Sequence, residues 1–429
     1  MIVGKLSLTP RIVIADDSHL QTATVTIGIL LGSRNERVSK YGLVHLLEHM
    51  IFRGSLTHPS KRQLLEPLVD VAAKFNGGTE RDLTVYFATV LAEDLYVALD
   101  VLIEMVKQPL LDANDLQIEK QAVINEIKSN DSVPSRKLLS RMLLPNVLLH
   151  FPEYSHDVTG TIEDVNNASQ QDLVQLVTSA YGDPDKIVIS VNCNLNEISG
   201  QQKYLEKTIT ELWHRIPYSY ASRPSGATSN YVTRPTAHSG GATASAANYI
   251  STASAAPETF VALGWISAAF ESYESYVLDW ISAYLTGTLL SVLYLRLREQ
   301  TGYVYHVSSE QYDLDRTGVF VIAWQIAKPD RVNETTQIIQ EELSKLKQFN
   351  DRNQLTKWQK WIVRRFRMNM QDSSFLATLY TQQMLLRNGI RKVDDIVDLY
   401  SQITCRDIQR VSRQVFQTQA QTLAAIYPN

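Results

Sequence analysis

The sequence predicts an α+β protein of two homologous α/β-sandwich-like domains, in which an antiparallel or mixed sheet packs with helices. Both halves of the chain show the same order: a strand, helices, a strand pair, more helices and a closing strand. The 429 residues are too many for one ordinary domain. A stretch rich in Ser, Ala, Thr and Gly separates the halves. We therefore expect domains at residues 1–218 and 258–429, joined by a linker at 219–257.

Residue periodicity gives the elements of the first half. Strands are expected at residues 5–14, 21–31, 83–90 and 186–192. Helices are expected at residues 41–50, 61–74, 95–107, 113–129, 135–144, 170–180 and 204–215. Pro67 should kink the helix at 61–74, and the Asn-Gly dipeptide at 76–77 predicts a turn over residues 76–79.

The second half repeats this pattern after the linker, which itself has strand character around Tyr249 and Ile250. Strands are expected at residues 259–266, 311–312, 319–326 and 422–426. Helices are expected at residues 273–297, 331–347, 354–370, 373–387 and 405–415.

Composition narrows the class of protein. Hydrophobic residues make up 44% and charged residues 20%, as in soluble globular proteins. The net charge of -4 gives no case for nucleic acid or an anionic membrane as the main partner. The two cysteines are far apart in sequence, the N-terminus lacks a signal-peptide pattern, and no run reaches membrane-span length. We therefore expect a cytoplasmic protein.

One helix carries the clearest chemistry. His45, Glu48 and His49 form H-x-x-E-H, and residues three and four apart share one face of a helix. Two imidazoles can hold Zn²⁺, and a nearby carboxylate that is not a ligand can accept a proton from a water molecule. Chance placement of two core histidines and a glutamate is the competing explanation, so a third ligand is needed.

The helix at 113–129 offers that ligand. Glu119 and Glu126 are seven residues apart and share one face two turns apart. Their apolar neighbours predict a largely buried helix: Ile118, Ala122, Val123, Ile124 and Ile127. A buried carboxylate needs a partner, and zinc with its histidines would provide one. An exposed, solvated Glu119 is the simpler alternative.

Here the chain resembles the pitrilysin-type inverted zinc peptidases. That family carries H-x-x-E-H, a distal glutamate ligand and another glutamate seven residues before it, and the step from His49 to Glu126 matches the family spacing. The resemblance implies a clam-shell architecture with zinc bound by His45, His49 and Glu126. It implies Glu48 as general base, with Glu119 orienting the ligands.

The stretch from Asn76 to Thr79, followed by Thr84, resembles the edge strand with which the family binds substrate backbone. Gly77 stands where alanine is usual. We expect the substrate to add as a β-strand to the edge formed by residues 83–90, with contacts from Asn76, Thr79 and Thr84. Asn76 and Thr79 are alternatively plain turn residues.

The second half resembles the family at residues 297–305, where Arg298 and Tyr305 match the pair that contacts substrate near the scissile bond. Tyr303 replaces the usual leucine. Arg298 is alternatively an ion-pair partner of Glu299, and Tyr305 a core residue. The second half has no H-x-x-E-H, since residues 289–294 at the equivalent place read Leu-Leu-Ser-Val-Leu-Tyr.

Together these features predict a zinc metalloendopeptidase that hydrolyses peptides or unfolded segments and processes, for example, a peptide precursor. The resemblance implies a chamber closed by four α+β units. This chain supplies two units, so a homodimer or a heterodimer with a related, inactive chain is expected. Two alternatives remain: a non-catalytic core or scaffold subunit of a heterodimeric peptidase, and a zinc hydrolase that acts on something other than peptides.

Overall fold

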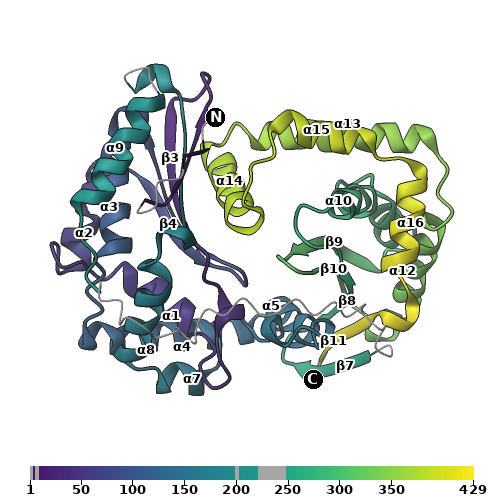
Figure 1. Cartoon of the computed structure of the whole chain (residues 1–429). Helices are drawn as coiled ribbons and strands as arrows, with labels where there is room; N and C mark the ends of the chain where they lie inside the picture. Colours follow the sequence, from purple (N-terminus) through teal and green to yellow (C-terminus); the bar gives the residue numbers. More distant parts are fainter. Residues whose placement is uncertain (1–2, 5–8, 199–201, 221–247) are drawn as a thin grey trace. The chain divides into compact units, whose positions relative to one another are not determined.

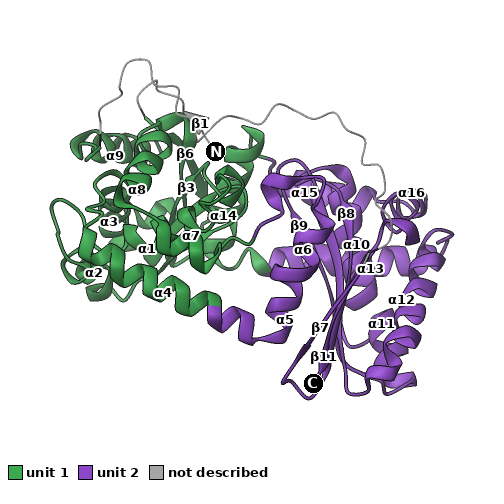
Figure 2. Ribbon diagram, turned by 90° about the horizontal axis from the view of Figure 1, so that it is seen from below, with its two compact units in different colours: residues 1–127, 157–236, 369–390 green, residues 128–156, 237–368, 391–429 purple. Residues whose placement is uncertain are grey.

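The computed structural model describes residues 3–4, 9–198, 202–220 and 248–429 (Figure 1). The chain divides into two compact units, each built from segments that are separate in sequence (Figure 2). Unit 1 consists of residues 1–127, 157–236 and 369–390. Unit 2 consists of residues 128–156, 237–368 and 391–429.

Unit 1 contains a six-stranded sheet in the order β1-β2-β6-β3-β5-β4. Its strands are β1 (Val3–Gly4), β2 (Arg11–Asp16), β3 (Thr22–Ile29), β4 (Lys74–Thr79), β5 (Thr84–Leu91) and β6 (Ile187–Cys193). Unit 2 contains a five-stranded sheet in the order β7-β11-β8-β10-β9. Its strands are β7 (Asn248–Ser254), β8 (Thr259–Ser267), β9 (Val304–Asp313), β10 (Gly318–Ile326) and β11 (Thr422–Pro428).

The two sheets share one five-strand arrangement. In unit 1, β2 runs parallel to β6, and β6, β3, β5 and β4 follow as antiparallel neighbours. In unit 2, β7 runs parallel to β11, and β11, β8, β10 and β9 follow as antiparallel neighbours. This shared order confirms the predicted pair of homologous α+β domains with mixed sheets.

Helices cover the sheets of both units (Figure 1). The helices of unit 1 are α1 (Leu43–Ile51), α2 (Lys61–Asp70), α3 (Leu95–Lys107), α4 (Ala113–Ser132), α7 (Ile162–Asn167), α8 (Gln170–Leu176), α9 (Gln202–Arg215) and α14 (Ser373–Arg387). The last turn of α4 is counted with unit 2. The helices of unit 2 are α5 (Pro134–Lys137), α6 (Leu144–Val147), α10 (Tyr273–Thr286), α11 (Val292–Tyr294), α12 (Val332–Leu346), α13 (Arg352–Asn369), α15 (Val393–Gln402) and α16 (Cys405–Val415).

Each half of the chain contributes a helical segment to the unit of the other half. Helix α14 packs on β3 and β6, where Ser373 Oγ lies 2.7 Å from Thr24 Oγ1 and its carbonyl accepts a 3.1 Å hydrogen bond from Asn192. In return, residues 138–147 pack on β8 and β11 of unit 2. This exchange differs from the continuous domains expected at 1–218 and 258–429. The expected linker lies largely outside the described residues, although β7 forms at its end.

Tertiary pairing overrides several local signals. Residues 76–79 form a strand instead of the expected turn, because they pair with β5 along their whole length. The helix expected at 61–74 therefore ends at Asp70. Strand β5 has β3 on one side and β4 on the other, so the expectation that residues 83–90 form the sheet edge is wrong, and β4 is the edge strand. Helix α15 was not expected, and residues 5–8 of the first expected strand lie outside the described residues.

Helix α1 lies inside the core of unit 1. Its apolar side chains are almost fully buried: Leu43, Val44, Leu46, Leu47, Met50 and Ile51. It packs against β4, α7 and α8. No helix in the described part of the chain combines the length and apolar character needed to cross a bilayer.

Candidate metal centre

The N-terminus of α1 is capped from outside the helix. Glu36 accepts hydrogen bonds from the Gly42 amide (2.9 Å) and the Val44 amide (2.7 Å). A carboxylate there satisfies free amides and complements the positive end of the helix dipole. Glu36 thus fixes the start of the helix that carries the histidines, a role that its place in the sequence alone did not reveal.

Two backbone segments cross closely at the same point. Gly42 has φ +87° and Gly160 has φ +74°, which favour glycine. A Cβ atom on Gly160 would lie 2.1 Å from the Tyr41 carbonyl oxygen. The crossing therefore admits no side chain, and it ties the loop before α7 to the start of α1.

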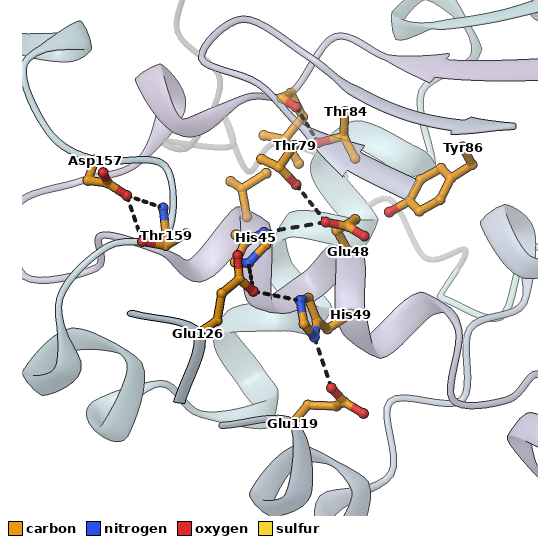
Figure 3. Close-up of polar contacts among 12 residues, drawn as sticks. His45, Glu48, His49, Thr79, Thr84, Tyr86, Glu119, Glu126, Asp157 and Thr159 are labelled. Atoms are coloured by element: carbon orange, nitrogen blue, oxygen red, sulfur yellow. Dashed lines mark hydrogen bonds and ion pairs between the residues drawn. The ribbon is translucent and has the colours of Figure 1, made fainter. Parts of the chain in front are cut away.

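Two histidines of α1 and one glutamate of α4 converge beside this helix (Figure 3). Glu126 Oε2 lies 3.2 Å from His45 Nε2 and 3.6 Å from His49 Nε2. Ligands at about 2.0–2.1 Å from a tetrahedral zinc ion are separated by about 3.3 Å. Both distances to Glu126 are compatible with a shared zinc ion, and the structure brings the three predicted ligand residues together.

Glu48 is a rival third ligand, because one ligand atom each of His45, Glu48 and His49 lies within 4.8 Å of the others. Its Oε2, however, lies 3.3 Å from His45 Nδ1, whereas Glu126 Oε2 lies close to Nε2 of both rings. Glu126 is therefore better placed than Glu48 to share a metal ion with both Nε2 atoms. Glu48 is buried beside the set, and its Oε2 also accepts a long 3.4 Å hydrogen bond from Thr79 Oγ1 (Figure 3).

Glu119 lies behind His49. Its Oε2 is 2.9 Å from His49 Nδ1, and the residue is only 8% exposed, which excludes the solvated alternative. Such a contact fixes the tautomer of a metal-binding histidine and leaves the other nitrogen for the metal. The expectation that the surrounding helix is largely buried is wrong, because Ile118 is 53% exposed and Ala122 is exposed as well.

The carboxylates control protonation of the rings. Burial lowers the pKa of His45, but hydrogen bonds to Glu126 and Glu48 outweigh it and raise the pKa to about 9. For His49, burial is likewise outweighed by hydrogen bonds to Glu119 and Glu126, which raise its pKa to about 9. Hydrogen bonds from the two histidines lower the pKa of Glu126 well below its usual value. A metal needs neutral rings, so its binding displaces protons.

The other predicted substrate residues are placed differently. Asn76 is exposed and alternates with Gly77 and Thr79 along β4, so its side chain lies on the opposite face from theirs. Thr84 is fully buried and donates a 2.8 Å hydrogen bond to the Leu31 carbonyl, which leaves its hydroxyl occupied within the fold. Thr79 alone among these three brings its side chain to the metal centre.

Arg298 and Tyr305 belong to unit 2. The Arg298 guanidinium lies 4.9 Å from the ring centroid of Tyr294 and 5.2 Å from that of Tyr305, and it also bonds the Tyr294 hydroxyl. Tyr305 is 74% exposed, so it is not a core residue. The contact between Arg298 Nε and Glu299 is long, at 3.9 Å. The arginine and tyrosine therefore form a stacked surface pair.

Fold and site together define a duplicated α+β chain with an H-x-x-E-H motif in its first half. Residues 11–153 match the family model described as insulinase, peptidase family M16. Residues 230–359 match the model described as peptidase M16 inactive domain, in agreement with a second half that lacks H-x-x-E-H. The chain therefore carries both M16 domain types and belongs to peptidase family M16.

Known proteins are similar to the whole chain or to part of it. The uncharacterized zinc protease YmxG of Bacillus subtilis is 26% identical, covering 98% of this chain and 96% of that protein. The human mitochondrial-processing peptidase subunit beta is 28% identical over 42% of this chain and 36% of its own length. Cytochrome b-c1 complex subunit 1 of Caenorhabditis elegans is 26% identical over 51% of this chain and 46% of its own length. The crystal structure of a protease from Helicobacter pylori superposes with a TM-score of 0.87 at 20% identity, covering 100% of this chain and 99% of that one.

Proposed function

We propose that the protein is a zinc metalloendopeptidase that cleaves peptides or unfolded segments. The observation that carries this proposal is the position of Glu126 Oε2, 3.2 Å and 3.6 Å from the Nε2 atoms of His45 and His49. Glu48 lies beside this set without being needed as a ligand. Zinc, when bound, would lower the pKa of a water ligand and polarise the scissile carbonyl.

Glu48 would act as the general base. Its carboxylate would take a proton from the attacking water and return it to the leaving amine. Glu48 is a buried residue of α1, and its carboxylate faces the edge strand β4, where Thr79 donates a hydrogen bond to it. Glu119 would keep the Nδ1 proton on His49, so that Nε2 faces the metal.

The substrate would bind in extended form along β4. This strand is the edge of its sheet, so its outer main-chain groups can pair with an added strand. Thr79 and Gly77 lie on the face of β4 next to Glu48, so a peptide on this edge would pass the general base. Asn76 would contact the substrate from the other face of β4. Thr84 is not assigned to the substrate, because its strand pairs with β3 and β4 and its hydroxyl bonds the Leu31 carbonyl. We assign Arg298 and Tyr305 to the substrate backbone and the developing oxyanion.

A dimer fits this proposal, as a homodimer or with a related chain that need not be active. Two similar proteins are named as subunits, one of a processing peptidase and one of the cytochrome b-c1 complex. A peptide precursor is a suitable substrate class. A cytoplasmic location rests on the two free cysteines, Cys193 and Cys405.

The competing function is a non-catalytic subunit, since one similar protein is named as a subunit of the cytochrome b-c1 complex and not as a protease. The intact Glu48 beside the metal set favours catalysis. Glu48→Gln decides between the two. We expect it to bind zinc like the wild type but to cleave unfolded peptides about 10²-fold or more slowly, while Glu66→Gln on exposed α2 should retain activity. A zinc-loaded wild type that cleaves no peptide in a peptide library, alone or with a related chain, would contradict the proposal.

A further inference from the structure

The contacts between α1 and α4 continue beyond the metal ligands. Three basic side chains recur every four residues here: His45 and His49 lie on α1, and Arg53 lies in the turn just after the helix ends at Ile51. On α4 they meet acidic residues in reverse order. His45 meets Glu126, His49 meets Glu126 and Glu119, and Arg53 meets Glu119 and Asp115.

Arg53 joins the last two acids of this series. Its Nε lies 3.0 Å from Asp115 Oδ1, and Nη2 contacts the same oxygen. Its Nη1 lies 3.4 Å from Glu119 Oε1. The other oxygen of Glu119, Oε2, lies 2.9 Å from His49 Nδ1. Both oxygens of this buried carboxylate are thus held, one by the arginine and one by the histidine.

We propose that Arg53 is a positioning residue for the metal centre. Anchored by Asp115, it fixes the rotation of the Glu119 carboxylate so that Oε2 faces the Nδ1–H of His49. The Nε2 lone pair of His49 then points to the metal in a single orientation. The inference rests on the zinc-binding part of the proposed function and is independent of peptide cleavage.

Replacing Arg53 would change zinc affinity in opposite directions through charge and through positioning. A guanidinium near the centre repels a dication, so removal of its charge alone would strengthen zinc binding. Loss of positioning weakens it, because residues behind a metal ligand typically contribute about 10–100-fold in affinity. An arginine that only links α1 to α4 would change stability and leave zinc affinity of the folded protein unaltered. The sign of the change therefore separates the three roles.

The test is the zinc dissociation constant of the full chain, measured by competition with a chromophoric chelator at a temperature where circular dichroism shows a folded protein. We expect Arg53→Met to weaken zinc binding about 10–100-fold. The zinc affinity of Arg53→Lys should fall between those of the wild type and Arg53→Met, because lysine keeps the charge but lacks the planar fork of arginine. Lys61→Met is the matched control, since Lys61 acts on Glu119 through charge without a hydrogen bond. It should bind zinc as tightly as the wild type or more tightly.

A double-mutant comparison shows whether Arg53 acts through Glu119. In a Glu119→Gln background, Arg53→Met should change zinc affinity less than about threefold, because the held carboxylate is already lost. If Arg53→Met does not fold, Asp115→Asn removes the anchor with little change of shape and should weaken zinc binding in the same direction. Equal or tighter binding by Arg53→Met or Asp115→Asn, or an undiminished effect in Glu119→Gln, would overturn the inference. A wild type that binds zinc but cleaves no peptide would refute only the proposed function.

Discussion

Zinc binding should release protons from the two histidines, and the number follows from their environment. The pKa values of His45 and His49 are about 9 without metal, so each ring is about 99% protonated at pH 7. Both rings must be neutral to bind zinc through nitrogen. We therefore expect about two protons to be released per zinc ion at pH 7 and about one at pH 9, with affinity rising about 100-fold per pH unit between pH 7 and pH 8.

Isothermal titration calorimetry in buffers of different ionisation enthalpy measures this release directly. His19→Gln is the control, because His19 is exposed and lies outside the metal set. It should release as many protons as the wild type. Release of fewer than one proton at pH 7, or an affinity that does not change from pH 7 to pH 8, would refute the assigned protonation of the centre.

Three further predictions concern the support of the site. Gly160→Ala should lower the free energy of unfolding by about 1–3 kcal/mol, because it forces a side chain into the crossing at positive φ. At Gly78 on exposed β4, an added Cβ atom would meet no other atom within 4 Å. Gly78→Ala should therefore lower the free energy of unfolding far less, and urea titration of both variants measures the difference. Glu36→Ala removes the cap of α1 and should cost about 0.5–2 kcal/mol, with weaker zinc binding by chelator competition. Without metal, stability should fall as pH rises from 6.5 through 9, by at most about 1.4 kcal/mol per pH unit for each raised histidine. The sign follows because a histidine whose pKa is higher in the folded than in the unfolded state stabilises the fold only while its ring is protonated. Thermal unfolding with chelator across this pH range measures the decrease.

The helices and central strands could be predicted because apolar periodicity records burial. The strand pattern at 21–31 and the apolar run at 319–326 each form a strand with neighbours on both sides, β3 and β10. Strand β4 could not be predicted this way, because its Asn-Gly-Gly sequence lacks β-branched residues and its pairing with β5 decides the conformation. The exchange of α14 into unit 1 was equally hidden, because periodicity shows that a helix has an apolar face and not which sheet covers it.

The proximity of His45, His49 and Glu126 could be predicted because the spacing is local on each helix and the resemblance linked the two helices. The residues that support this cluster could not be predicted from the sequence. Glu36 reaches the amides of α1 over six and eight residues, and Arg53 reaches α4 through the fold. These contacts depend on how the loops return to the helix, which no residue pattern records. The same holds for Thr84, whose hydroxyl the fold uses for a backbone contact.

The most direct test of the account is anomalous diffraction at the zinc edge from crystals of the zinc-loaded protein. The account predicts one strong peak in unit 1 at about 2.0–2.1 Å from His45 Nε2, His49 Nε2 and a Glu126 oxygen, with Glu48 outside bonding distance. A peak bonded to Glu48 in place of Glu126, or no peak between these residues, would contradict it.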